Sequence, residues 1–204
     1  MDNTLKLLQE WNAWTYNKEE ILQERANNNG KYIMRGILQK SNTLNQNGRI
    51  YPKEILEREV RNYQKFIAER RALGELDHPE SSVVELKNSS HLVTEAYMDG
   101  DVCHGTVEIL DTPSGKILKS LIDSGVTLGI SSRGVGSTRH EGDHQVVQDD
   151  FQLICWDFVS EPSTPGAFMM KEGKEIKESD LRKHFNKSDR VDRILNDILD
   201  WSNE

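Results

Sequence analysis

Two segments of this chain pair a candidate base with a candidate nucleophile. Residues 74–80 read GELDHPE, in which His78 precedes a proline that restricts its backbone to an extended conformation. Imidazole exchanges a proton near neutral pH, so His78 could act as a general base. Residues 125–136 read GVTLGISSRGVG, in which an apolar stretch runs into Ser131 and Ser132. Glycines let a backbone approach a substrate closely and could leave N–H groups facing an oxyanion.

A third segment supplies an acid. Residues 155–162 read CWDFVSEP, and Asp157 lies between large apolar residues. A carboxylate buried there would need a partner, such as a neutral histidine or an arginine. Each segment alone also has an ordinary interpretation: a surface loop for the histidine, a β-turn for the serines and a solvent-facing edge strand for the acid. Together they occur in the order histidine, serine, acid.

Metal binding is a weaker interpretation. Cys103 and His104 are adjacent in the sequence, so on a strand they point to opposite faces and would rarely share an ion. His140, Asp143 and His144 lie in a glycine-containing loop that is better explained as a solvated hairpin tip. We therefore predict neither a metal site nor a cofactor.

The elements that must position the three segments are mostly strands. The pattern of apolar residues predicts strands over residues 31–39, 91–99, 101–110, 125–133 and 145–159, the last as one or two strands. It predicts helices over 3–28 (one kinked or two short), from Pro52 to near Arg71, over 116–124 and over 191–201. Asp99-Gly100 gives the strongest hairpin signal.

The length of 204 residues suits one domain with terminal appendages, and the formal net charge is -8. We expect an N-terminal helical segment (1–29), a main domain (30–170), and a polar linker with an amphipathic helix (171–204). No apolar run is long enough for a membrane helix, and net negative charge argues against nonspecific nucleic-acid binding. Two cysteines and no secretory signal favour a reducing compartment.

Several motifs agree in order and spacing with one family. The stretches are SNTLNQNGRIYP, GELDHP, TEAYMDGDVCHGTVEILDTPSGKILKSLIDSG, LGISSRG and WDFVSEPSTPGA. Over residues 31–168 the chain resembles the prohead core (scaffold) proteases of T-even-type tailed phages, a family related more distantly to the herpesvirus assemblins. The resemblance implies a herpesvirus-protease-like β-barrel core surrounded by helices. Together with the helical terminal segments predicted above, which lie outside the resemblance, this gives an expected α+β fold.

The resemblance also implies a function. The family consists of serine endopeptidases that mature the capsid from inside the prohead, within the bacterial cytoplasm. They cleave scaffold and capsid proteins and finally themselves. We therefore expect phage scaffold or core proteins and the major capsid protein as substrates, and no membrane or nucleic-acid partner. A homo-oligomer is compatible with the herpesvirus relatives, which dimerise.

Residue roles carry over by motif. His78 would be the general base and Ser131 the nucleophile, with Ser132 as the runner-up. Asp157 would be the third member, with Glu161 and Asp77 as alternatives. We expect a turn at residues 132–134. The backbone N–H groups of Ser132, Arg133 and Gly134 would bind the oxyanion there, and Arg133 would add positive charge.

The family cuts after a glutamate that follows Leu or Ile by two positions, usually before a small residue. A pocket for glutamate needs a cation, and the candidates are Arg133, Arg139 and Arg35. The pattern ends at Glu10, Glu24, Glu57, Glu69, Glu75 and Glu178. Only Glu178 precedes a small residue, Ser179, so we predict self-processing at Ile176-Lys177-Glu178/Ser179.

Two alternatives belong to other functional classes. The first is a catalytically silent scaffold or assembly protein with the same fold. The second is a serine hydrolase that acts on small esters. The presence of the histidine, the serines and the acid together favours the protease.

Overall fold

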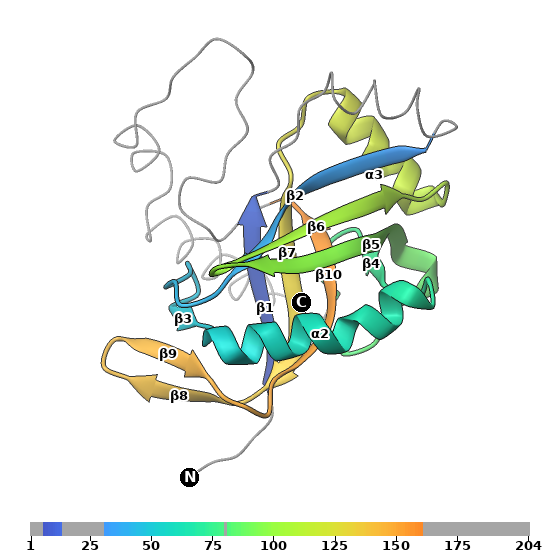
Figure 1. The fold of residues 1–204 in the computed structure, drawn as a ribbon. Coiled ribbons are helices and arrows are strands. Elements are labelled where there is room, and N and C mark those ends of the chain that lie inside the picture. Colours follow the sequence, from blue (N-terminus) through green and yellow to red (C-terminus); the bar gives the residue numbers. More distant parts are fainter. Residues whose placement is uncertain (1–5, 14–30, 80, 161–204) are drawn as a thin grey trace, which may run out of the picture. The chain divides into compact units, whose positions relative to one another are not determined.

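The computed structural model describes residues 6–13, 31–79 and 81–160, all within the compact unit Met1–Met169. Strands predominate, which confirms the mixed α+β class (Figure 1). The strands are β1 (Lys6–Ala13), β2 (Tyr32–Lys40), β3 (Arg49–Ile50), β4 (Leu73–Glu75), β5 (Ser89–Asp99), β6 (Val102–Ile109), β7 (Gly129–Gly136), β8 (Thr138–Glu141), β9 (His144–Val147) and β10 (Gln152–Val159). The described helices are α2 (Lys53–Ala68), α3 (Pro113–Asp123) and the 3-10 turn η1 (Leu86–Asn88).

These strands form three hydrogen-bonded sheets in the described part of the chain. Their orders are β1-β7-β10, β2-β6-β5-β4 and β3-β9-β8. Pairing is antiparallel except between β3 and β9. A closed barrel is not detected among these strands, so the structure confirms the α+β class without the barrel.

Local sequence signals produce the elements that were expected from them. β5 and β6 form the predicted hairpin, with Gly100 at φ +59°, a left-handed conformation that glycine adopts without strain. α2 follows Pro52, as predicted. α3 begins after Thr112, whose Oγ1 accepts a hydrogen bond from the Gly115 N–H at 3.0 Å.

Helix α2 contributes buried side chains to the hydrophobic core beside the sheets. It packs against β5 and β10 (Figure 1). Its buried Tyr63 ring meets the fully buried Trp156 ring of β10 edge to face at 4.8 Å between centroids. Such aromatic pairs contribute about 0.5–1.5 kcal/mol beyond the area they bury. α2 therefore packs directly against β10, the strand that carries the candidate acid.

The helix predicted over residues 3–28 is wrong for Lys6–Ala13. This segment is strand β1, which pairs antiparallel with β7 from Lys6↔Gly136 to Ala13↔Gly129. Leu8 is 1% exposed in the core. Pairing with a strand more than a hundred residues away overrides the local helical pattern, because a backbone edge beside β7 is better satisfied by a strand. The remainder of that predicted helix lies outside the described residues.

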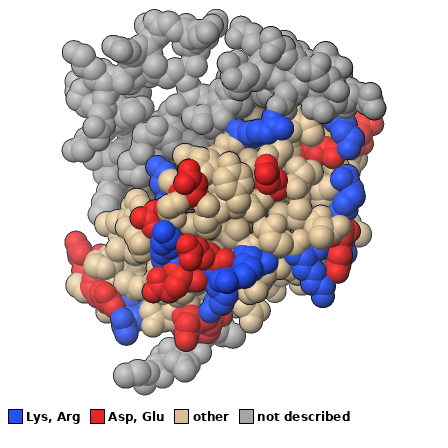
Figure 2. All heavy atoms as spheres, viewed as in Figure 1, with Lys and Arg blue, Asp and Glu red and all other residues tan. Residues whose placement is uncertain are grey.

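The C-terminal predictions, the linker and the helix over 191–201, lie outside the described residues, and the domain boundaries stay predictions. No helix in the described ranges is long and apolar enough to cross a membrane. On the face drawn in Figure 2, basic and acidic side chains are intermingled and form no single basic stripe.

Candidate active site

The side chains of His78, Ser131 and Asp157 meet in one hydrogen-bonded row. Nδ1 of His78 lies 2.9 Å from Oδ2 of Asp157, and its Nε2 is in hydrogen-bond contact with Oγ of Ser131. The histidine thus has an acid on one ring nitrogen and a hydroxyl on the other. This is the geometry in which a base can take a proton from a nucleophile while an acid fixes its tautomer.

Strand register brings the serine and the acid together. β7 and β10 pair antiparallel with Ser131 directly opposite Asp157. Directly opposite residues project to the same face of a sheet. One step along the strand, Ser132 lies opposite Trp156 and projects to the other face, where its buried Oγ has no hydrogen-bond partner among the described residues. The structure therefore brings Ser131 to the histidine and keeps Ser132 away from it.

The histidine reaches this face because β4 approaches β10 very closely. A Cβ at Gly74 would lie 2.1 Å from the Trp156 carbonyl oxygen and 2.3 Å from the His91 ring, so only glycine fits there. Beyond β4, Leu76 bridges to Phe158, and the Asp77 N–H donates to the Phe158 carbonyl at 2.8 Å. The GELDHP motif thus crosses from one sheet to another just before His78.

Asp77 turns the chain at this crossing. Its φ is +64°, in the left-handed region that aspartate tolerates better than most residues. Its side chain is exposed, whereas Asp157 is fully buried against His78. Asp77 therefore contributes here through its backbone, and of the two predicted acids that the structure describes, Asp157 is the one at the imidazole. Glu161 lies outside the described residues.

Arg133 occupies a position different from the one expected. Its side chain is fully buried, with Nε 2.9 Å from Oδ2 of Asp157 and Nη2 in an ion pair with Glu75. Nη1 donates to the Ser81 carbonyl at 2.7 Å, and Nη2 lies 3.2 Å from Sγ of Cys155. With both carboxylates beside it, the guanidinium is not available to a substrate glutamate.

The oxyanion turn expected at residues 132–134 is instead the middle of β7. β7 has β1 on one side and β10 on the other, with Gly134 opposite Leu8 and Leu153. Backbone N–H groups of a central strand point along the sheet to its neighbours. Gly134 is also needed for packing, because a Cβ there would lie 2.4 Å from the Phe151 ring. These amides therefore lie within a sheet, next to an irregularity of β10 between Leu153 and Cys155, and not in the expected turn.

Asp157 is held as a carboxylate. Burial on its own would raise its pKa, but hydrogen bonding from His78 and the positive charge of Arg133 outweigh burial and lower the pKa below the usual range. The Glu75 N–H adds a further hydrogen bond to Oδ1 at 2.9 Å. The acid is thus ionised wherever the neighbouring imidazole can exchange a proton.

A second histidine, His91, lies in the core behind the site. Its Nε2 is 2.9 Å from the Trp156 carbonyl oxygen and its Nδ1 2.9 Å from Oγ of Ser90. Burial lowers the pKa of His91 to about 4, so the ring is neutral at pH 7. It packs edge to face on Phe158 at 4.8 Å and supports β10.

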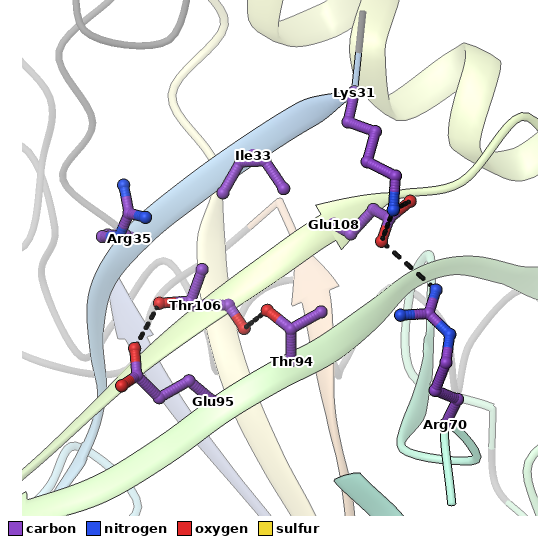
Figure 3. Close-up of a pocket in the computed structure, with 8 residues that line it drawn as sticks. All are labelled: Lys31, Ile33, Arg35, Arg70, Thr94, Glu95, Thr106 and Glu108. Carbon is purple, nitrogen blue, oxygen red and sulfur yellow. Dashed lines mark hydrogen bonds and ion pairs between the residues drawn. The ribbon is translucent and has the colours of Figure 1, made fainter. Parts of the chain in front are cut away.

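The other predicted cations lie in different surroundings. Arg139 is exposed on β8 and pairs with Glu141. Arg35 is exposed on β2 and lines a surface pocket of about 460 Å³ across β2, β6 and β5 (Figure 3). In the same pocket Glu108 pairs with Lys31 at 3.1 Å. Glu178 and Ser179 lie outside the described residues.

One further feature concerns metal binding. Within residues 6–13, 31–79 and 81–160, no group of three or more His, Cys, Asp or Glu side chains is placed to hold a metal ion.

The sequence indicated Glu75 only as a match to a cleavage pattern and did not predict its contact with Arg133. The available signal was that Arg133 is the one charged residue in the stretch GVTLGISSRGVG, where burial would demand an acidic partner.

Comparison with known proteins gives the class. The chain belongs to the prohead core protein serine protease family, which it matches over residues 18–181. Among curated proteins it is 35% identical over 156 residues to the prohead core protein protease of Enterobacteria phage T4, covering 74% of this chain and 72% of that protein. Among solved structures it is similar to the bacteriophage T4 capsid assembly protease, with a TM-score of 0.66 and 25% identity over 77% of this chain and 99% of the other.

Proposed function

We propose that this chain is a serine endopeptidase of prohead maturation, with Ser131 as nucleophile, His78 as general base and Asp157 as the orienting acid. The contact of one imidazole with both the Ser131 hydroxyl and the Asp157 carboxylate carries the proposal. Family membership supports a protease, and the geometry supports the catalytic type.

The proposed chemistry follows from the row of hydrogen bonds. Nε2 of His78 takes the proton of Ser131 as Oγ attacks the peptide carbonyl, and it then gives that proton to the leaving amine. A water molecule, activated by the same nitrogen, hydrolyses the acyl-enzyme. Asp157 accepts the Nδ1–H and stabilises the imidazolium formed in both steps. Removing the hydroxyl of Ser131 therefore stops the reaction at its first bond.

Access to the nucleophile supports an enzyme that must be switched on. Ser131 is 0% exposed, and the side chain of His78 is 7% exposed. A peptide carbonyl has to reach Oγ within bonding distance, which this arrangement does not allow. We propose that the form described here is the dormant precursor, and that assembly with scaffold opens the site.

The proposed cleavage rule is the family one, after glutamate in Leu/Ile-x-Glu sequences. Four of the matches in this chain lie in folded elements: Glu10 in β1, Glu57 in α2, Glu69 at its C-terminal end, and the fully buried Glu75. A protease needs an extended, accessible segment, so these sites are protected. We propose Glu178/Ser179 as the self-processing site, and Arg35 or Arg139 rather than Arg133 as the cation that reads glutamate.

The proposed substrates are the scaffold and capsid proteins of the phage, inside the prohead in the host cytoplasm. The similar T4 protein is described as a capsid assembly protease, which supports this assignment. We also retain the more distant relationship to the herpesvirus assemblins as a hypothesis about ancestry.

Intact-mass analysis tests the proposal. Wild type, Ser131→Ala and Ser132→Ala are each incubated alone and with purified scaffold protein. We expect wild type and Ser132→Ala to cut the scaffold and to lose the mass beyond Glu178, whereas Ser131→Ala stays intact. Cleavage by Ser131→Ala would refute the assignment of the nucleophile. If none of the three proteins cleaves even with scaffold present, the catalytically silent assembly protein becomes the better explanation.

A further inference from the structure

A buried ion pair stands directly behind the proposed catalytic row. The guanidinium of Arg133 contacts the carboxylates of both Asp157 and Glu75, and all three side chains are 0% exposed. We propose that Glu75 neutralises Arg133, so that the negative charge of Asp157 remains available to His78. The inference rests on the serine protease function proposed above, and it makes Glu75 and Arg133 positioning residues.

The buried charges around the imidazole add up to one negative charge. Asp157 and Glu75 contribute two negative charges and Arg133 one positive charge. The other buried groups contribute none at neutral pH, because burial lowers the pKa of His91 to about 4 and raises those of Cys155 and Tyr63 well above their usual values.

Among the described residues, the groups around the cluster of His78, Asp157, Arg133 and Glu75 include exposed ones as well. The charged or titratable side chains of this cluster and its surroundings come from β4, β5, β7, β10, α2 and the adjoining loop: Glu75, His91, Arg133, Cys155, Asp157, Tyr63, Asp77, Glu85 and Lys87. Glu85 and Lys87 pair with each other at 2.8 Å at the surface and largely cancel. Asp77 is exposed, so water screens its charge.

Charge balance decides how well the site accepts a proton. When His78 becomes imidazolium, the buried cluster passes from one negative charge to none. Without Glu75, Arg133 would already neutralise Asp157, and the imidazolium would add an uncompensated positive charge. Without Arg133, two carboxylates would share the site, and their combined negative charge would favour the imidazolium more strongly than in the parent. Glu75 and Arg133 therefore shift the charge that His78 meets in opposite directions, and together they leave the single negative charge of Asp157.

The same pair also holds the loop that follows His78. Arg133 donates to the Ser81 carbonyl at 2.7 Å, and Glu75 accepts from the Glu85 N–H at 3.0 Å. Substitutions of the pair can therefore change structure as well as charge. A decisive experiment has to separate the two effects, and opposite charges allow this, because losing Glu75 and losing Arg133 must act in opposite directions.

The experiment follows the ring of His78 by NMR in the full-length chain. A Ser131→Ala background prevents self-cleavage, ring-labelled histidine gives the signal, and His78→Gln assigns it. We expect Glu75→Gln to move the pH midpoint of this resonance down by about one unit, Arg133→Gln to move it up, and the double variant to return it to the parent value. The matched control is Glu59→Gln, which removes a buried glutamate paired with Arg58 at 2.9 Å on α2, and it should leave the midpoint unchanged.

The outcomes are distinguishable. An unmoved midpoint in Glu75→Gln, or shifts of Glu75→Gln and Arg133→Gln in the same direction, would overturn the proposal. If Arg133→Gln does not fold, the midpoint of the His78 resonance must be higher in the double variant than in Glu75→Gln. A midpoint that is lower in the double variant refutes the proposal. If Glu75→Gln does not fold, the double variant must match the parent, and a displaced midpoint refutes it. These midpoints need no cleavage, so they are separate from the mass assay that tests the protease function.

Discussion

Gly74→Ala should damage both stability and cleavage, because the β4–β10 crossing has no room for a methyl group. The added Cβ would lie 2.1 Å from the Trp156 carbonyl oxygen, whereas real Cβ contacts do not fall below 3.0 Å. The two strands must therefore separate by about 1 Å at this point, since 3.0 minus 2.1 is 0.9. Overpacking of this kind typically costs about 1–3 kcal/mol of unfolding free energy.

The separation also reaches the site. The 2.8 Å hydrogen bond from Asp77 to Phe158 spans the same crossing and precedes His78 by one residue. A misplacement of about 1 Å in catalytic geometry can reduce the rate about 10²-fold. We expect Gly74→Ala to lose stability in urea unfolding, measured in a Ser131→Ala background, and to cleave scaffold about 100 times more slowly in an otherwise wild-type chain.

A second glycine provides the control for backbone effects. Gly48 has φ +72° in a turn, and a Cβ there meets no atom within 4 Å. Gly48→Ala should therefore lose about 1 kcal/mol to left-handed strain and keep its cleavage rate. If Gly74→Ala has the same stability in urea and the same cleavage rate as the parent, the close approach of β4 to β10 does not position the histidine and the reasoning fails.

The other expectations concern the acid and the buried titratable groups. Asp157→Asn keeps the shape of the side chain but cannot stabilise an imidazolium, so the kcat for scaffold cleavage should fall by about 10³–10⁴, and a fall of less than tenfold would contradict the role of the acid. Because the pKa of His91 is lowered to about 4 in the fold, the unfolded chain binds the proton first, and urea unfolding should show about 3 kcal/mol of stability lost as the pH falls from about 6.5 to 4. In His91→Gln this part of the pH slope should be absent, and an unchanged slope would assign it elsewhere. Burial raises the pKa of Cys103 to about 12 and that of Cys155 well above its usual value, so neither thiol should be alkylated at pH 8 until urea unfolds the chain, as peptide mass mapping would show.

The parts of the fold that sequence could predict are those that neighbouring residues decide. A left-handed glycine at position 100 closes the β5–β6 hairpin, and Pro52 precedes the first turn of α2. Neither feature needs information from elsewhere in the chain. The strand β1 differs, because the edge of β7 induces it, and no property of KLLQEWNA alone shows that edge.

The site divides in the same way. The residue types and their order identified His78, the serine pair and Asp157 as candidates, because each chemistry demands a particular side chain. Sequence could not choose between Ser131 and Ser132, since that choice depends on which of them lies opposite Asp157 in the β7–β10 register. The register is a property of two strands at once.

Arg133 shows why the remaining role was misassigned. A cation two residues from a nucleophile suggests a substrate contact, and the strand places both on one face as expected. That face, however, is also where β10 brings Asp157 and where β4 brings Glu75. A guanidinium so enclosed is stable only with carboxylates around it. The alternation that puts Arg133 beside the serine therefore makes it part of the acid's environment, and the cation proposed to bind a substrate glutamate has to come from outside β7.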